Sequence, residues 1–169
     1  VKALDLSAAD TIIEIGPGQG ALTWPLLERI KHLTAIEIDR DLIPRLQATA
    51  PRYGDLHIVE ADVLTVDFTA LAEGGTIRLV GNLPYNISSP ILFHALEHAA
   101  VISDMHFMLQ KEVVERMAAS HGNKVYGRLS VMLQAYCHIE PLFTVPPSAF
   151  TPAPKVDSAI VRMTPKSVA

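Results

Sequence analysis

The chain has 169 residues, 49% of them hydrophobic, which fits one domain of ordinary size with a substantial apolar core. It carries 14 basic and 18 acidic side chains, so its net charge of −4 excludes a uniformly basic nucleic-acid-binding module. No apolar run approaches the roughly 18 residues of a membrane span, and the single cysteine, Cys137, excludes an internal disulfide.

We expect Cys137 to be a small buried hydrophobe, as free cysteines often are. No signal peptide is visible, and a lone reduced cysteine fits the cytoplasm, so we expect a cytoplasmic protein. Residues 1–169 are expected to form one domain.

The first predicted strand is Thr11–Ile15, a short β-branched run. The loop Gly16–Gly20 follows at once, and the apolar periodicity of Ala21–Ile30 predicts a helix. Glycines allow positive φ and let a ligand approach the backbone. A strand, a glycine loop and a helix in this order predict a nucleotide-binding α/β sheet.

The glycine loop alone is compatible with two cofactors. Gly16, Gly18 and Ala21 satisfy the G-x-G-x-x-A pattern of dinucleotide-binding proteins, so an NAD-dependent oxidoreductase is an alternative. Pro17, however, removes a backbone N–H that would bind a pyrophosphate. Glu14 places a carboxylate beside the loop, which repels a pyrophosphate and suits the cationic sulfonium of S-adenosylmethionine.

Acidic residues lie in or directly after the next two predicted strands. Glu37 lies in the second, residues 33–38, about 20 residues beyond the glycines, where an acid accepts hydrogen bonds from ribose hydroxyls. Asp62 follows the third, residues 56–60, and is placed to accept from an adenine amino group, with Ile38 and Val63 packing the ring. An N-cap role explains Asp62 equally well.

The fourth predicted strand, Ile77–Gly81, is followed by Asn82, Leu83, Pro84 and Tyr85. The Asn82 side-chain carbonyl and a backbone carbonyl beside the proline can accept both hydrogens of an exocyclic amino group. Pro84 stiffens the turn, and Tyr85 offers a face on which a base can stack. The alternative is a strand-ending turn with a half-buried tyrosine.

The remaining pattern continues the alternation. Residues 90–98, 112–119 and 128–136 are predicted helices, residues 105–109 a strand, and residues 138–143 and 159–163 a closing antiparallel pair. His94 and His98 are four residues apart, but the HExxH order is not met and no third ligand is evident. We therefore favour a surface helix over a metal centre.

These blocks resemble one family in order and spacing. The Glu14–Gly20 segment, Glu37, Asp62 and the Asn82–Tyr85 segment match the class I methyltransferase motifs of the ribosomal RNA adenine N6-dimethyltransferases. Four further segments resemble the bacterial small-subunit branch, which is linked to kasugamycin sensitivity: Gly81–Pro90, Met108–Val113, Tyr126–Ser130 and Pro147–Ser158.

The resemblance implies a Rossmann-like α/β fold, a doubly wound and mostly parallel sheet with an antiparallel last strand. It implies S-adenosylmethionine-dependent dimethylation of adenines in small-subunit ribosomal RNA by a monomer that uses no metal and no membrane. The cofactor-binding residues would be Glu14, Gly16, Gly18, Gly20, Glu37, Ile38, Asp62, Val63 and Asn82. The catalytic residues would be Asn82, Leu83, Pro84, Tyr85 and Phe150, with Phe150 as the second stacking ring.

The charge distribution fits a cofactor site in the first part of the chain and an RNA-binding surface in the second. Residues 1–100 hold 7 basic and 13 acidic side chains, whereas residues 101–169 hold 7 and 5. The acidic part suits a cationic cofactor, and we expect RNA to contact the part with the basic surplus. The candidate RNA-binding residues there are Lys111, Arg116, Lys124, Arg128 and Lys155.

The chain also departs from the family pattern. The Gln-Asn-Phe motif that closes over the cofactor does not appear before Thr11, and the helical domain that follows the last strand in family members is not seen. We expect the catalytic core of a longer protein. Two alternatives share its fold: a large-subunit RNA methyltransferase conferring antibiotic resistance, and a non-catalytic ribosome-assembly factor. Residues 86–90 and the Phe150 loop favour the small-subunit enzyme, and Asn82 with Tyr85 favours catalysis.

Overall fold

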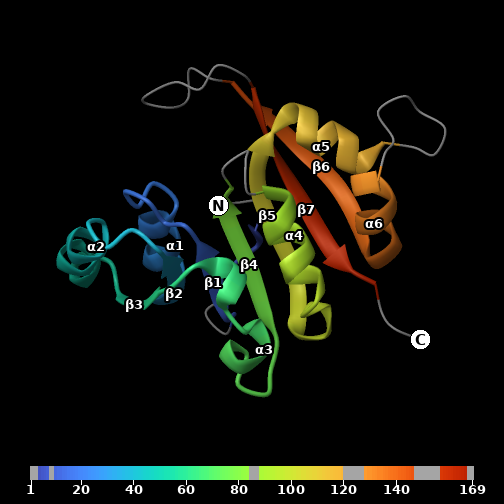
Figure 1. The fold of residues 1–169 in the computed structure, drawn as a ribbon. Helices are drawn as coiled ribbons and strands as arrows, with labels where there is room; N and C mark the ends of the chain where they lie inside the picture. Colours follow the sequence, from blue (N-terminus) through green and yellow to red (C-terminus); the bar gives the residue numbers. More distant parts are fainter. Residues whose placement is uncertain (1–3, 8–9, 84–87, 120–127, 147–156, 167–169) are drawn as a thin grey trace. The chain divides into compact units, whose positions relative to one another are not determined.

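The computed structural model describes residues 4–7, 10–83, 88–119, 128–146 and 157–166. The chain divides into two compact units, Val1–Asn82 and Leu83–Ala169 (Figure 1). Among the helices of these described ranges, none is long and apolar enough to cross a bilayer.

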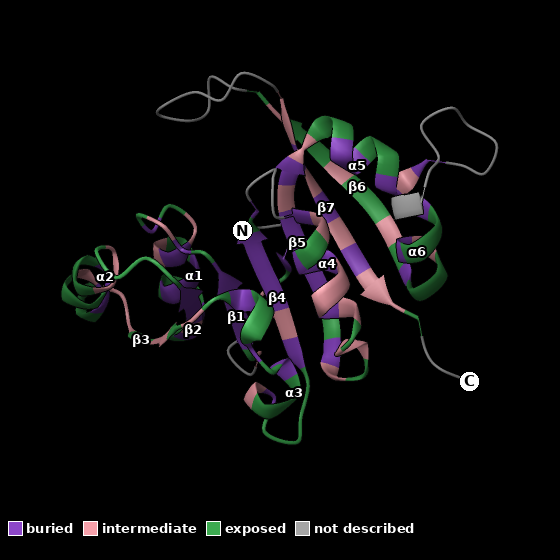
Figure 2. Ribbon diagram, viewed as in Figure 1, coloured by how far each residue is buried: buried purple, intermediate pink, exposed green. Residues whose placement is uncertain are grey.

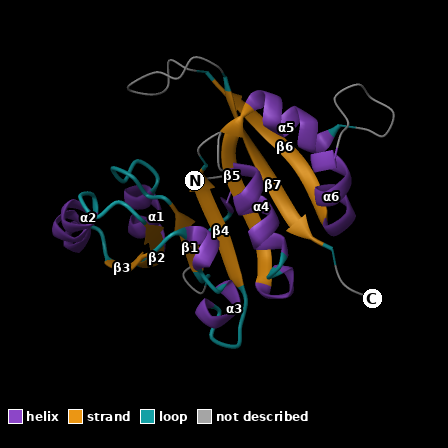
Figure 3. Ribbon diagram, viewed as in Figure 1, coloured by secondary structure: helices purple, strands orange, loops and turns teal. Residues whose placement is uncertain are grey.

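The first unit is a parallel sheet with strand order β3-β2-β1-β4, in which strands alternate with helical segments (Figure 3). Its elements are β1 (Ile12–Ile15), α1 (Thr23–Ile30), β2 (His32–Glu37), α2 (Ile43–Thr49), η2 (Ala50–Arg52), β3 (Asp55–Glu60), η3 (Val63–Thr65), α3 (Phe68–Leu71) and β4 (Ile77–Asn82).

Burial explains why the central strands read as apolar runs. All four residues of β1 are buried, whereas β3 at the edge has no buried residue (Figure 2). Helix α1 buries Thr23, Leu26, Leu27 and Ile30, the spacing of one helical face. Leu26, Leu27 and Ile30 pack in one cluster with Ile12 of β1 and Val80 of β4.

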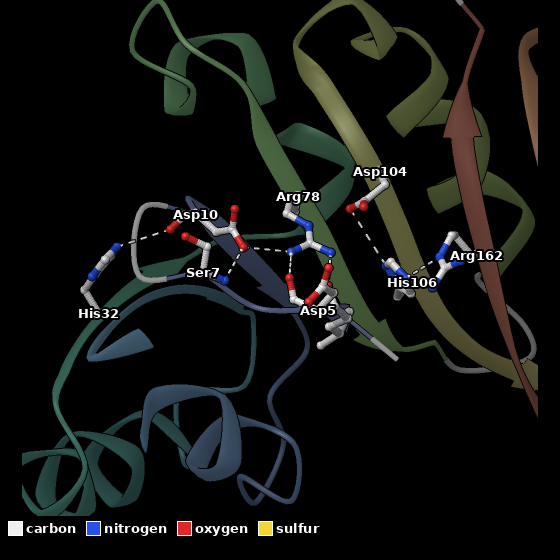
Figure 4. A network of polar contacts seen from close by, with 9 residues as sticks. Asp5, Ser7, Asp10, His32, Arg78, Asp104, His106 and Arg162 are labelled. Atoms are coloured by element: carbon white, nitrogen blue, oxygen red, sulfur yellow. Dashed lines mark hydrogen bonds and ion pairs between the residues drawn. The ribbon is translucent and has the colours of Figure 1, made fainter. Parts of the chain in front are cut away.

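Arg78 ties the chain before β1 to the start of β4. Its guanidinium donates to a carboxylate oxygen of Asp10 at 2.8 Å and also contacts the Leu4 carbonyl oxygen (Figure 4). The Asp10 carboxylate also accepts from the backbone N–H of Ser7 at 2.8 Å. These contacts lie near the amino end of β4, so they stabilise the sheet rather than line its carboxyl edge.

The second unit contains three antiparallel strands in the order β5-β7-β6. Its elements are α4 (Ser88–Leu96), η5 (Ala99–Val101), β5 (Ile102–Gln110), α5 (Lys111–Ala118), α6 (Arg128–Tyr136), β6 (Cys137–Val145) and β7 (Ser158–Pro165). Strand β7 pairs antiparallel with both neighbours, and the register of β6 shifts between Pro141 and Phe143.

Polar contacts join the elements of this unit. The Gln134 amide of α6 donates to the carbonyl oxygens of Met117 and Ala119, at 2.7 and 2.9 Å, and so caps the end of α5. Arg162 of β7 donates to the buried His106 ring of β5 at 3.0 Å (Figure 4). Cys137 is buried as predicted, and burial raises the pKa of its thiol to about 11, which makes it unreactive.

The predicted fold class is confirmed by the parallel strands β1 to β4 and the antiparallel strand β7. The boundaries differ in places. Helix α4 starts at Ser88 rather than 90, because proline is tolerated in a first helical turn. Strand β5 starts at Ile102 rather than 105. The short helices α2 and α3 were not predicted.

Candidate active site

Strand register brings the predicted motifs of the first unit to one edge. Ile15 of β1 pairs with Ile36 of β2 on one side and with Gly81 of β4 on the other. The residues that follow this row are Gly16, Glu37 and Asn82. Since the strands are parallel, their carboxyl ends meet at the same edge, where ligands bind in open α/β sheets. Glu37 and Asn82 are separated by two strand spacings, a distance of about 10 Å between their backbones.

The glycine loop is shaped by positive φ angles. Gly16 and Gly18 have φ of +65° and +58°, and no described atom lies within 4 Å of the position that a Cβ would take at either residue. Their backbone conformation thus requires glycine while leaving open space beside the chain. Gly20 is needed for packing, since a Cβ there would lie 2.3 Å from Nε1 of Trp24.

Glu37 organises this loop. Its side chain is buried, and its Oε1 accepts from the backbone N–H of Gly18 at 3.1 Å. Its Oε2 accepts from the N–H groups of Ile38 and Asp39 at 3.0 and 3.1 Å. A carboxylate offers about four acceptor positions, so capacity for a further donor remains. The predicted site residue is therefore also a structural one.

Glu14 lies buried at the carboxyl end of β1, with 2% of its surface exposed. The Thr23 hydroxyl donates to its Oε1 at 2.6 Å. Burial raises the pKa of the Glu14 carboxyl from 4.5 to about 7; the Thr23 hydrogen bond opposes this rise and the charge of Glu37 adds to it. The negative charge expected from the sequence is therefore only partial near pH 7 when no cation is bound.

Asp62 caps the helical turn η3, where its Oδ1 accepts from the backbone N–H of Leu64 at 3.0 Å. The capping role left open by the sequence is thus present. Ile38 is 63% exposed, whereas Val63 is buried. Exposed Ile38 offers an apolar surface against which a planar ring can pack.

Asn82 ends β4 and is exposed. The preceding Gly81 allows β4 to approach β1 closely, because a Cβ there would lie 2.8 Å from the Ile15 carbonyl oxygen. In the second unit, the Leu83 side chain is buried and its N–H donates to the Met108 carbonyl oxygen at 3.0 Å. The predicted catalytic residues Pro84, Tyr85 and Phe150 lie outside the described residues.

The predicted RNA-binding residues are described in part. Lys111 begins α5 and is exposed. Arg116 is also exposed, and its guanidinium lies 3.1 Å from the Glu112 carboxylate, a pairing that competes with phosphate contacts. Arg128 begins α6. Lys124 and Lys155 lie outside the described residues.

The edge of the first unit is thus acidic and partly apolar. Glu14, Glu37 and Asp62 bring three carboxyl groups to the ends of neighbouring strands, and Ile38 adds an apolar side chain. This arrangement suits a cation that carries a ribose and a heterocycle, and it disfavours a pyrophosphate. Sequence reasoning missed Thr23, whose hydroxyl binds Glu14 only because α1 folds back along β1.

Comparison with known proteins gives a family match over the whole chain. The family described as ribosomal RNA adenine dimethylase matches residues 1–169. A "Ribosomal RNA small subunit methyltransferase A" from Xanthomonas oryzae pv. oryzae is 67% identical over 169 residues, and one from Xanthomonas campestris pv. campestris is 64% identical. The chain spans 64% of the length of these relatives.

Two solved structures are similar across nearly the whole chain. A dimethyladenosine transferase from Plasmodium falciparum is 34% identical with a TM-score of 0.85, and the match covers 98% of this chain and 59% of that one. The 23S rRNA methyltransferase ErmE is 31% identical with a TM-score of 0.84, and the match covers 98% of this chain and 65% of that one.

Proposed function

The chain belongs to the ribosomal RNA adenine dimethylase family, and we propose that it transfers methyl groups from S-adenosylmethionine to N6 of adenines in small-subunit ribosomal RNA. The observation that carries the proposal is the strand register, in which Gly16, Glu37 and Asn82 follow one paired row across three parallel strands. A cofactor-binding loop, a ribose-binding acid and an amide that binds an amino group thereby share one edge.

The residues present fit the proposed cofactor. The glycine loop leaves space for a ligand beside Gly16 and Gly18. Glu37 would bind the ribose hydroxyls, which replace Gly18 as donors or use the remaining acceptor capacity. Asp62 would accept from the adenine amino group through the oxygen that does not cap η3, with Ile38 and Val63 beside the ring. Glu14 would give up its proton to balance the positive charge.

Catalysis by this chain would depend on position and electrostatics. The adenine amino group is a poor nucleophile, because its lone pair is delocalised into the ring. The Asn82 side-chain carbonyl and the Leu83 backbone carbonyl would accept its two hydrogens, which favours a pyramidal nitrogen with an exposed lone pair. When bound, S-adenosylmethionine supplies an electrophilic methyl group on a sulfonium. The same carbonyls would stabilise the positive charge that develops on N6, and its proton leaves to water.

The adenine must leave its base stack to reach these carbonyls. We propose that Tyr85 and Phe150 hold it between their rings and that Pro84 keeps Asn82 and Tyr85 in fixed relation. Lys111, Arg116, Lys124, Arg128 and Lys155 would bind RNA phosphates. The second methylation requires room for one N6-methyl group while the Asn82 contact is kept.

The small-subunit substrate is favoured over the large-subunit one by the relatives' names and identities. Relatives at 64–67% identity are named small-subunit methyltransferases, whereas the 23S rRNA methyltransferase is 31% identical. We infer that the partner is the small ribosomal subunit, met in the cytoplasm where ribosomes assemble.

The test is methyl transfer from labelled S-adenosylmethionine to purified small and large ribosomal subunits that lack the modification. We expect N6,N6-dimethyladenosine in small-subunit RNA only. Methylation of large-subunit RNA would favour the resistance-type activity. Tight binding of small subunits without any transfer, by a protein that still binds the cofactor, would favour a non-catalytic assembly factor.

A further inference from the structure

Three potential metal ligands cluster at the carboxyl end of α4, among residues given no role in the proposed reaction. They are His94, Glu97 and His98, and their ligand atoms all lie within 4.8 Å of one another. The spacing of three and four residues puts them on one face of a helical turn. Residues 94–98 also read H-x-x-E-H, the inverted order of the HExxH zinc motif.

The backbone already holds these side chains together. The N–H of Glu97 is shared between the carbonyl oxygens of Phe93 and His94, at 3.3 and 3.2 Å, and the N–H of His98 donates to Ala95 at 3.0 Å. The chain therefore continues one turn past the end of α4, and no backbone rearrangement is needed to bring the three groups together.

The side chains also converge. Nδ1 of His94 lies 3.8 Å from Oε2 of Glu97. The rings of His94 and His98 meet edge to face with centroids 5.3 Å apart. The His94 side chain is 14% exposed and that of Glu97 is 73% exposed, so His94 is the inner group and Glu97 approaches from the solvent.

We propose that His94, Glu97 and His98 bind one divalent transition-metal ion of the zinc class. Two ligand atoms on a tetrahedral Zn²⁺, each about 2.1 Å from the ion, are about 3.4 Å apart. Small side-chain rotations that move each ligand atom by roughly 1 Å bring the three atoms to that spacing. Two imidazole nitrogens and one carboxylate oxygen suit Zn²⁺, Ni²⁺ or Cu²⁺, whereas Mg²⁺ prefers oxygen ligands. Water completes the coordination.

Binding would stabilise the end of α4. The ion would link a residue of the helix to two residues of the turn that follows it, and a ligand that binds only the folded form raises the melting temperature. The proposal does not depend on the proposed function, since none of the three residues is assigned to the cofactor or the adenine.

Calorimetric titration of the protein with ZnCl₂ at pH 7.5 tests the site. We expect one ion per chain, at least tenfold weaker binding in His94→Gln and in His98→Gln, and a smaller loss in Glu97→Gln. His57→Gln and His138→Gln are matched controls, because both histidines are exposed and lie outside the cluster. They should bind Zn²⁺ like the unchanged protein.

The melting temperature and its reversal by EDTA distinguish a defined metal site from nonspecific binding of Zn²⁺ to exposed histidines. Zn²⁺ should raise the melting temperature, EDTA should reverse the rise, and the double variant His94→Gln/His98→Gln should not respond. Unaltered Zn²⁺ binding by a folded double variant, or an equal loss in the two control variants, would overturn the proposal. Equal binding of Mg²⁺ would also contradict it.

Discussion

The carboxylate of Glu37 accepts a hydrogen bond from the backbone N–H of Gly18 at 3.1 Å. An acid at the end of β2 thereby holds the glycine loop that follows β1, before any ligand is present. The other oxygen of Glu37 binds the two N–H groups that follow it in the chain. Its orientation is thus fixed in advance, which reduces the side-chain entropy that Glu37 would lose on binding a ribose.

A comparison of Asp62 with Asp67 tests whether Asp62 binds the cofactor in addition to capping a helix. Asp62 caps η3 and Asp67 caps α3, where its Oδ1 accepts from Ala70 at 3.2 Å. Replacing either by alanine should cost about 1 kcal/mol of stability. Only Asp62→Ala should also weaken S-adenosylmethionine binding, by about 1–3 kcal/mol, because it loses the adenine contact. Parallel urea melts and cofactor titrations of both variants check this. Equal cofactor affinities would leave Asp62 as a cap alone.

The raised pKa of Glu14 predicts a pH-dependent stability. The folded protein holds the Glu14 proton more tightly than the unfolded chain, since the pKa rises from 4.5 to about 7. The contribution of this group is therefore fully present below about pH 4.5 and is lost as the pH rises through 7. Glu14→Gln, which stays neutral, should become more stable than the unchanged protein at pH 8, by about 3 kcal/mol.

Urea melts of both proteins at pH 5, 6, 7 and 8 measure this difference. The Thr23 hydroxyl donates to Glu14 at 2.6 Å, and a glutamine can accept the same hydrogen bond, so the variant should keep it. A bound sulfonium favours the ionised carboxylate, so cofactor affinity should rise with pH in the unchanged protein and not in Glu14→Gln. A stability difference that is the same at every pH contradicts the assignment.

Asn82 should matter for chemistry and little for folding. It is exposed at the end of β4, so Asn82→Ala should leave the melting temperature nearly unchanged. Single-turnover methyl transfer should slow by about two orders of magnitude or more, as expected for the loss of one preorganised hydrogen-bonding group. Transfer at a near-normal rate would show that Asn82 only forms the turn.

RNA binding should depend on the basic residues of the second unit. Reversing charge in Lys111→Glu and Arg128→Glu should weaken RNA binding, reduce its salt dependence and leave cofactor affinity unchanged. Arg45→Glu is the control, since Arg45 is an exposed basic residue on α2 of the other unit.

Tyr85→Ala should cost about 1–3 kcal/mol of base stacking with hardly any change in the salt dependence of RNA binding. Salt titrations of the four variants distinguish charge from stacking, and charge reversals without effect would place the RNA surface elsewhere.

The sequence predicts the elements whose pattern is local. Residues 11–15 and 77–81 read as strands because buried parallel strands are continuous apolar runs, and residues 128–136 match α6. Helices α2 and α3 escape prediction because they have seven and four residues, too few for a clear period. The acids of the candidate site were predictable because they lie in or directly after recognisable strands.

Contacts between residues far apart in the chain could not be predicted from the sequence. The Glu14 pKa depends on burial and on Thr23, and neither can be read from a motif. The hydrogen bond from Gly18 to Glu37 spans 19 residues and follows from the register of β1 and β2. The predicted helix 90–98 already places Glu97 near His94 and His98, and the structure adds that their ligand atoms lie within 4.8 Å of one another.

Calorimetry shows whether the carboxyl edge of β1, β2 and β4 binds S-adenosylmethionine. The protein is titrated with S-adenosylmethionine, its demethylated product and NAD, alongside Glu37→Ala and the control Glu60→Ala. Glu60 pairs with Glu37 in register, but its side chain is 54% exposed and binds Arg40. We predict that both sulfur compounds bind more tightly than NAD, that Glu37→Ala weakens them by about 1–3 kcal/mol and that Glu60→Ala does not. Tighter binding of NAD, or cofactor affinity unchanged in Glu37→Ala, would contradict the account.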